Sequence, residues 1–160
     1  MKRRDRIFTV ALGALALAGS VAITFGAAAR AGDASASVPP GDIRVNFLGC
    51  PNTKGKVKCA IYNSPDGFPT DRSKITQSAA SPVTGDRGVC VFKGLPPGNY
   101  AVAAFQDEDG TGKMRKNMLG IPQEVYGFSN DARNSLSAPS FDQAAFKYPG
   151  GTMDLTIHGK

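Results

Sequence analysis

The 22 residues from Phe92 to Lys113 constrain the fold of this chain more than any other segment. An apolar run ends there in a turn, Leu95-Pro96-Pro97-Gly98, where proline and glycine interrupt regular structure. The next residues, Tyr100 to Phe105, are apolar at both odd and even positions, which predicts a central strand buried on both faces. An acidic loop with two glycines follows. This order predicts a small β-sandwich with a polar loop at one end.

Apolar and polar residues also alternate in other parts of the chain, which predicts further strands. One strand is expected around residues 43–47 and a second around 57–62, close enough in sequence to pair as a hairpin. Two more are expected near residues 89–92 and 153–158. Short strands joined by glycine and proline turns, without a long amphipathic helix, favour an all-β antiparallel sandwich.

A segment of 43 residues, Asp107 to Pro149, lacks this alternation. It holds five of the eleven aromatic residues that follow residue 31, whereas disordered segments are poor in aromatic residues. We therefore expect a long ordered loop insertion that packs on the sandwich. One or two short helices are also expected. Asp71 can cap a helix over residues 72–77, and Ser140 with Gln143 matches a capping box.

The N-terminus has the pattern of a secretory signal peptide. Basic residues lie between Lys2 and Arg6, an uncharged run extends from Ile7 to Ala29, and small residues then occupy the positions that a signal peptidase reads. The 23-residue uncharged run could also span a bilayer as an uncleaved anchor. We expect a signal peptide at residues 1–31, a flexible lead-in at 32–41 and a single domain at 42–160. The domain would be periplasmic or secreted.

The net charge argues against one class of partner. The whole chain carries +6, and residues 1–31 hold five basic residues and one acidic residue, which gives +4. The other 129 residues hold 14 basic and 12 acidic residues, or only +2. A nucleic-acid-binding domain needs a basic stripe on its folded surface. We therefore expect no nucleic acid as a partner, and no membrane contact beyond the N-terminal segment.

Three cysteines occur, Cys50, Cys59 and Cys90. In an exported protein they should form one disulfide and leave one thiol. Cys50 and Cys59 flank the predicted hairpin, which favours their pairing. Cys59 and Cys90 both lie at inward positions of their strands and form the rival pair. The remaining thiol is expected to be a small buried hydrophobic group.

The acidic loop could bind Ca²⁺. Asp107, Asp109, Thr111 and Gly112 match the first half of a calcium-loop pattern, in which oxygen ligands on alternate residues converge on the ion. At later positions, where that pattern calls for an acidic ligand, this sequence has Arg115 and Met118. The alternative is a polar turn whose glycines adopt positive φ. No other cofactor is predicted.

A second candidate site follows the acidic loop. Tyr126, Phe128, Ser129, Asn130 and Arg133 combine aromatic, amide and guanidinium groups that suit recognition of a sugar or another polar ligand. In the alternative interpretation, Tyr126 and Phe128 fasten the long loop to the sheet.

No set of catalytic residues is visible. His158 is the only histidine. It is expected at an outward position near the chain end, without the partners that a catalytic triad or a zinc site requires. The expected function is therefore a non-catalytic binding or accessory domain with an unknown ligand. One alternative is a hydrolase of envelope polymers that pairs Asp107 or Asp109 with Glu124. Another is a structural envelope component whose outward Arg44, Lys56 and Lys58 face anionic polymers or lipid.

An ordered set of motifs resembles an exported bacterial family catalogued as domain of unknown function 2141 (DUF2141). The motifs are Leu-Pro-Pro-Gly-Asn-Tyr-Ala-Val at residues 95–102, the acidic loop at 107–113, Gly-Ile-Pro at 120–122, Tyr-Gly-Phe-Ser-Asn-Asp-Ala-Arg at 126–133 and Pro-Ser-Phe-Asp at 139–142. The resemblance implies an immunoglobulin-like or transthyretin-like β-sandwich in the periplasm or outside the cell. It implies no established activity. Thr111 and Arg115 depart from the family's usual acidic loop.

Overall fold

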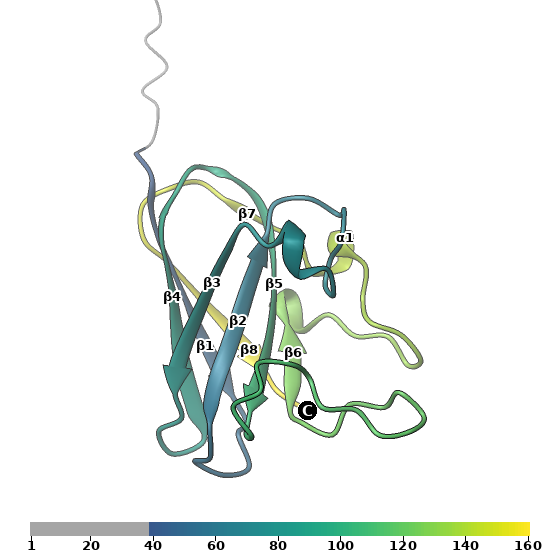
Figure 1. Cartoon of the computed structure of the whole chain (residues 1–160). Coiled ribbons are helices and arrows are strands. Elements are labelled where there is room, and N and C mark those ends of the chain that lie inside the picture. Colours follow the sequence, from purple (N-terminus) through teal and green to yellow (C-terminus); the bar gives the residue numbers. More distant parts are fainter. Residues whose placement is uncertain (1–38) are drawn as a thin grey trace, which may run out of the picture. The chain divides into compact units, whose positions relative to one another are not determined.

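The computed structural model describes residues 39–160, which form a β-sandwich with short helical turns at one side (Figure 1). The predicted signal peptide and most of the predicted lead-in lie outside the described residues. No helix in the described part of the chain has both the length and the apolar character needed to cross a bilayer. The elements, in chain order, are β1 (Gly41–Leu48), β2 (Lys56–Tyr62), η1 (Arg72–Lys74), β3 (Gln77–Pro82), β4 (Arg87–Leu95), β5 (Gly98–Asp107), β6 (Tyr126–Phe128), η2 (Ser129–Asp131), α1 (Phe141–Ala144), β7 (Phe146–Tyr148) and β8 (Met153–His158).

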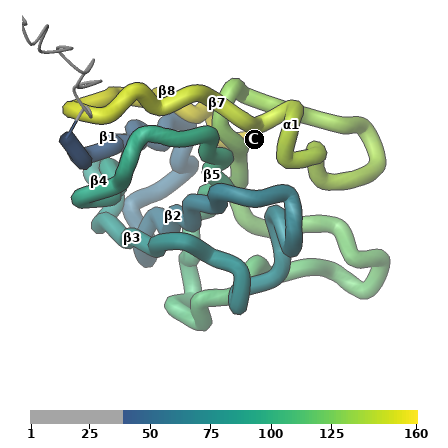
Figure 2. Tube along the Cα trace, turned by 90° about the horizontal axis from the view of Figure 1, so that it is seen from above, coloured from purple at the N-terminus to yellow at the C-terminus, as the bar shows by residue number. Residues whose placement is uncertain are grey.

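The strands form two layers, which are separated in the view from above (Figure 2). One layer has the order β4-β1-β8 and the other has the order β3-β2-β5-β6, with β7 paired to the start of β5. The predicted all-β sandwich is confirmed. One strand pair differs from the expected antiparallel pattern, because β8 runs parallel to β1. A parallel pair needs a long connection, and the segment between β5 and β8 helps to supply it.

The core explains why β5 is apolar on both faces. One face of β5 points into the space between the sheets, where Ile43, Val45 and Phe47 of β1 are fully buried. Its other face is covered by a second apolar cluster that includes Phe128 and Phe141 from the long segment. Pairing with β2 on one side and β6 on the other makes β5 central, as predicted. The long segment is thus ordered and packed on the sandwich, also as predicted.

The predicted hairpin of the first two strands is wrong, because β1 and β2 belong to different sheets. Beyond the end of β1, the backbone N–H groups of Gly49 and Cys50 both donate to the carbonyl oxygen of Asp86, at 2.9 Å each. These bonds hold the chain beside the start of β4 before it crosses to the other sheet. Sequence periodicity identifies a strand but not the sheet that it joins.

The favoured cysteine pairing is wrong for the same reason. The disulfide joins Cys59 of β2 to Cys90 of β4, the rival pair, with Cα atoms 6.3 Å apart. Both side chains point between the sheets, so the bond crosses the core from one layer to the other. Cys50 is a buried free thiol beyond the end of β1.

The segment that follows Asp71 forms a shorter helical turn than expected, and it is followed by a strand that was not expected. Asp71 caps a helical turn, since its Oδ1 accepts from the backbone N–H of Ser73 at 2.9 Å, but that turn spans only Arg72–Lys74. From Gln77 the chain forms β3, an edge strand without a fully buried residue. The capping box of Ser140 and Gln143 is confirmed at the start of α1.

Candidate functional site

Asp107 ends β5 and is almost completely buried, with 1% of its surface exposed. Its Oδ2 accepts from the backbone N–H of Gly112 at 3.0 Å and lies 3.1 Å from Nζ of Lys58 on the neighbouring strand β2. Its other oxygen, Oδ1, is buried and has no hydrogen-bond partner among the described residues. Buried carboxylate oxygens normally have partners, so this oxygen calls for an explanation.

The chain packs closely around this carboxylate because two glycines allow it. Gly55, at φ +67°, lies so close to the backbone carbonyl of Asp107 that a Cβ atom would overlap it. Gly112, at φ +74°, brings its N–H to Asp107, and a Cβ there would lie 2.9 Å from Nζ of Lys58. Both conformations are unfavourable for other residues. The loop 108–113 thus folds back over the end of β5.

Asp109 lies in this loop and faces the same space. Its Oδ1 accepts from the backbone N–H of Thr111 at 3.0 Å. This bond, followed by one from the Thr111 hydroxyl, lowers the pKa of Asp109 below its ordinary value, so the carboxyl is ionised at neutral pH. The Thr111 hydroxyl also lies 3.3 Å from the carbonyl oxygen of Lys113 in the same loop.

Glu124 brings a third carboxylate to the same place from a distant part of the chain. It is 4% exposed. Its Oε1 accepts from the backbone N–H of Glu108 at 3.1 Å, and its Oε2 accepts from that of Arg115 at 2.9 Å. One carboxylate therefore fastens both sides of the acidic loop.

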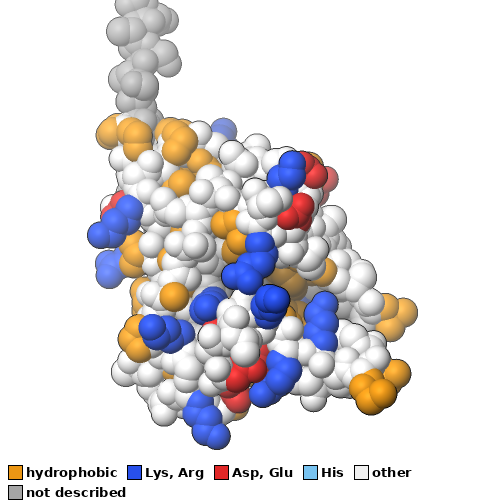
Figure 3. Space-filling view, viewed as in Figure 1, with side chains coloured by type: hydrophobic (Ala, Val, Ile, Leu, Met, Phe, Trp, Pro, Cys, Tyr) orange, Lys and Arg blue, Asp and Glu red, His pale blue; other side chains and the backbone are white. Residues whose placement is uncertain are grey.

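The three carboxylates form a cluster, defined here as Asp107, Asp109 and Glu124. One oxygen from each lies within 4.8 Å of the others, a spacing that suits ligands of a single cation. Two basic side chains lie beside the cluster: Lys58 contacts Asp107, and Nη2 of Arg115 lies 3.9 Å from Oε2 of Glu108. In the space-filling view, acidic side chains on the lower half are surrounded by Lys and Arg (Figure 3).

Sequence patterns named Asp107, Asp109 and Thr111 as metal ligands, and the structure brings the first two together with Glu124. The sequence suggests Glu124 only as a partner in the hydrolase alternative. A local motif could not have placed it in a metal site, because the hairpin between Arg115 and Gln123 must first return the chain to the loop. The sequence feature that could have indicated Glu124 is its position directly after a short turn-forming segment and before the apolar Val125.

The chain matches the model of a family described as "Uncharacterized protein conserved in bacteria (DUF2141)" over residues 45–156. The matched part covers most of the chain and includes the whole cluster. The chain belongs to this family. No match was found among curated proteins or among solved structures.

The second predicted site of this DUF2141 member, Tyr126 to Arg133, is mostly engaged in contacts within the fold. Phe128 is 9% exposed and packs edge-on against Tyr126 and Phe68. Ser129 is fully buried, where its hydroxyl accepts from the backbone N–H of Val102 at 2.9 Å and contacts the carbonyl of Ala144. These contacts fasten the long segment to β5.

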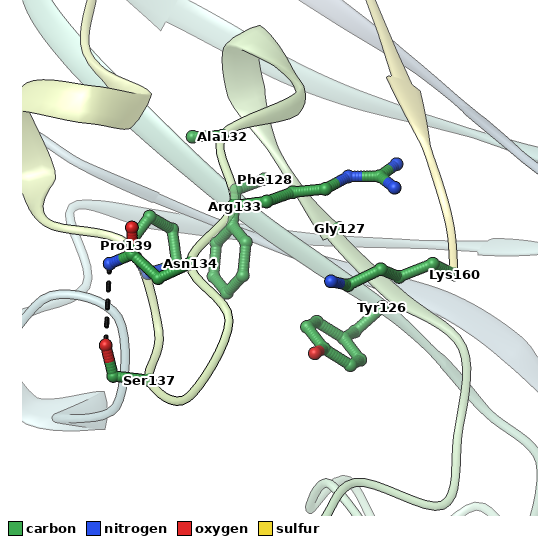
Figure 4. A pocket seen from close by; sticks show the side chains of 9 residues that line it. All are labelled: Tyr126, Gly127, Phe128, Ala132, Arg133, Asn134, Ser137, Pro139 and Lys160. Atoms are coloured by element: carbon green, nitrogen blue, oxygen red, sulfur yellow. Dashed lines mark hydrogen bonds between the residues drawn. The ribbon is translucent and has the colours of Figure 1, made fainter.

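Two further residues of this segment bind neighbouring backbone. Nδ2 of Asn130 donates to the carbonyl oxygen of Ala145 at 2.8 Å, and Nη2 of Arg133 donates to that of His158 at 3.1 Å. The hollow beside them is lined by Tyr126, Arg133 and Lys160, among others (Figure 4). Its volume of about 10 Å³ has room for a single water molecule. Pockets for small organic ligands are usually several hundred Å³.

A contact that the sequence did not predict joins Asp131 to His158. The Oδ1 of Asp131 accepts from the backbone N–H of His158 at 2.8 Å, and its Oδ2 lies 2.7 Å from Nδ1 of the imidazole. His158 is exposed, as expected. The pair fastens the end of β8 to η2.

Proposed function

We propose that this protein is an exported, non-catalytic accessory domain that binds a hard divalent cation, Ca²⁺, in the cluster of Asp107, Asp109 and Glu124. The observation that carries the proposal is the buried Oδ1 of Asp107, which has no partner among the described residues. An unsatisfied, buried carboxylate oxygen costs free energy unless something binds it. It belongs to a side chain that faces two other carboxylates.

The chemistry of the cluster selects the type of cation. All three ligand groups are carboxylates, and oxygen ligands suit Ca²⁺, Mg²⁺ or Mn²⁺ rather than Zn²⁺ or Cu²⁺. The three carboxylates come from a strand end, a glycine-containing loop and the end of a hairpin, so they form an irregular set of ligands. Ca²⁺ accepts six to eight oxygens in flexible geometry, whereas Mg²⁺ demands a regular octahedron. Bound water and backbone carbonyls would complete the coordination.

The hydrolase alternative has less support. A polymer-cleaving pair of carboxylates must reach the substrate, but Asp107 is 1% exposed and Glu124 is 4% exposed. Both oxygens of Glu124 also accept backbone N–H groups of the acidic loop and the hairpin, so they are already engaged within the fold.

Thermal melting of the chain from Gly32 to Lys160 tests the proposal, with excess Ca²⁺ and with chelator. This chain contains every described element and both apolar clusters. A ligand that binds only the native state stabilises it by about 2.7 kcal/mol at one hundred times its dissociation constant. We expect a higher melting temperature in Ca²⁺, and a smaller rise in Mg²⁺. Equal melting temperatures in Ca²⁺ and chelator would refute the cation site.

Two matched variants locate the effect. Asp107→Asn should abolish the calcium-dependent rise, because it removes the charge of the most buried ligand. Asp154→Asn removes one negative charge from an exposed position of β8 and should leave the rise intact. A rise that survives in Asp107→Asn would place the cation elsewhere.

A further inference from the structure

The described residues expose four large hydrophobic side chains, and all four lie on two loops. Met118 is 104% exposed, Leu119 is 83% and Ile121 is 53%, while Leu136 on the second loop is 100% exposed. Both loops extend to the same side of the sandwich in the two backbone views (Figures 1 and 2). Hydrophobic side chains protrude on that side in the space-filling view (Figure 3). Grouped exposed apolar side chains mark interaction surfaces, whereas scattered ones do not.

The first loop is a hydrogen-bonded hairpin, here called the apolar hairpin and defined as residues 115–123. Its base is closed by the N–H of Gln123, which donates to the carbonyl oxygen of Arg115 at 2.8 Å. At its tip, Oδ1 of Asn117 accepts from the N–H groups of Leu119 and Ile121, at 3.0 Å each. These bonds fix the loop while its apolar side chains point outward. A preorganised tip loses little conformational entropy when it binds.

Positive charge accompanies the exposed apolar groups. Lys113, Arg115 and Lys116 are all exposed, and no acidic residue occurs from residue 113 to 123. The second loop, residues 132–139, holds Arg133 and likewise no acid. Apolar side chains flanked by Lys and Arg are the arrangement that inserts into a bilayer interface while the charges meet anionic headgroups.

We propose that the apolar hairpin, together with Leu136, docks the domain on an anionic phospholipid surface. The two loops extend away from the sandwich (Figure 1), and the hollow lined by Tyr126 and Lys160 has a volume of only about 10 Å³, too small to receive a peptide side chain. Protruding loops of this kind fit a fluid lipid interface, which needs no complementary pocket. This surface departs from the expectation of no membrane contact beyond the N-terminus. It does not depend on the cation site.

Binding to vesicles tests the proposal, with the chain from Gly32 to Lys160 and vesicles of phosphatidylcholine with or without phosphatidylglycerol. Co-sedimentation should occur with phosphatidylglycerol and weaken as salt rises, because exposed charges are screened within about 10 Å at 0.1 M. Met118→Ser/Leu119→Ser should weaken binding at least about tenfold, since each side chain carries several buried methylene groups. Leu136→Ser should weaken it less. Both variants should melt like the wild type, because these side chains are largely or fully exposed.

Two double variants that each remove two positive charges separate local attraction to the headgroups from the effect of net charge. Lys113→Gln/Lys116→Gln should weaken binding at least about tenfold, at roughly fivefold per lysine. Lys93→Gln/Lys147→Gln removes the same charge from exposed residues of β4 and β7 and should bind like the wild type. Equal loss in both pairs, no binding by the wild type, or binding unaffected by the tip variants would overturn the proposal.

The cation dependence distinguishes this surface from the cluster. Docking through the apolar hairpin should persist in chelator. Binding that requires Ca²⁺ and survives in Met118→Ser/Leu119→Ser would overturn the proposal, since a cation bridge from the cluster to the headgroups would then explain it. Absence of any effect of Ca²⁺ on melting would refute the cation site alone and leave this inference standing.

Discussion

At the scale of single residues, Lys58 is the natural counter-charge of Asp107 when no cation is bound. Its Nζ lies 3.1 Å from Oδ2 of Asp107, and its side chain is 33% exposed, so it can move toward solvent. A positive charge this close opposes the binding of a second one. Lys58 is therefore expected to weaken the cation site while it stabilises the cation-free fold.

Lys58→Met keeps the aliphatic stem but removes the charge. We expect Ca²⁺ affinity to rise at least about tenfold in calorimetric titration, given the short distance between the charges. In chelator, the variant should unfold more readily than the wild type, by about 1–3 kcal/mol, because a buried carboxylate loses its partner. Lys56→Met, an exposed neighbour on the same strand, is the control and should change neither quantity. Unchanged or weaker affinity in Lys58→Met would contradict this role.

At the scale of elements, the contact between Asp131 and His158 joins η2 to the end of β8. Burial of Asp131 raises the pKa of its carboxyl, but the hydrogen bonds from the backbone and imidazole of His158 outweigh burial and hold the pKa below the ordinary value of 3.8. A carboxyl whose pKa is lowered by folding stabilises the native state above the unfolded-state pKa. That stabilisation is lost as the pH falls through the lower native-state value.

Asp131→Asn should therefore destabilise the protein near neutral pH and have progressively less effect below about pH 3.8. The effect should be small, because exposed pairs contribute about 0–1 kcal/mol. Urea unfolding of wild type and variant across pH 2 to 7 measures it, with the difference between the two curves as the readout. Asp154→Asn, on the exposed face of β8, controls for general charge effects. A difference that grows toward low pH would reverse the predicted sign.

The elements also show how far the sequence leads. Strands with one fully apolar face, such as β1, could be predicted because burial on one side imposes period-two alternation. Strand β3 was missed because this edge strand of alanine, serine and a terminal proline buries no side chain fully. The three-residue strands β6 and β7 are too short for any periodicity. Partner choice between the sheets is a long-range property, so the hairpin of β1 with β2 was predicted wrongly.

The same distinction holds for the candidate site. Asp107 and Asp109 could be named because acids on alternate residues beside glycines form a local pattern. Glu124 joins them only through the return of the apolar hairpin, and Lys58 only through the register of β2 with β5. Side chains that meet through tertiary structure leave no mark in a short sequence window. The sequence therefore predicts that a strand ends near Asp107, but not which side chains from other elements lie around it.

At the scale of the whole molecule, the two layers are held together by the apolar core and by one covalent bond across it. Cys59 and Cys90 lie on strands of different sheets, and both are buried, at 3% and 0% exposed. The disulfide closes a loop with a sequence separation of 31 residues. It restricts the unfolded chain, and for a loop of this length the chain-entropy relation gives about 3–4 kcal/mol of stabilisation.

Replacing both partners, Cys59→Ala/Cys90→Ala, should lower the melting temperature by roughly 10–20 °C, as expected for that loss in a domain of this size. Reductant should lower the melting temperature of the wild type by a similar amount and leave the double variant unchanged. Cys50→Ala provides the control. Burial, with a smaller contribution from the charge of Asp86, raises the pKa of the Cys50 thiol and keeps it unreactive, so this variant should retain the full response to reductant. If the response were lost in Cys50→Ala instead, Cys50 would be one partner of the disulfide.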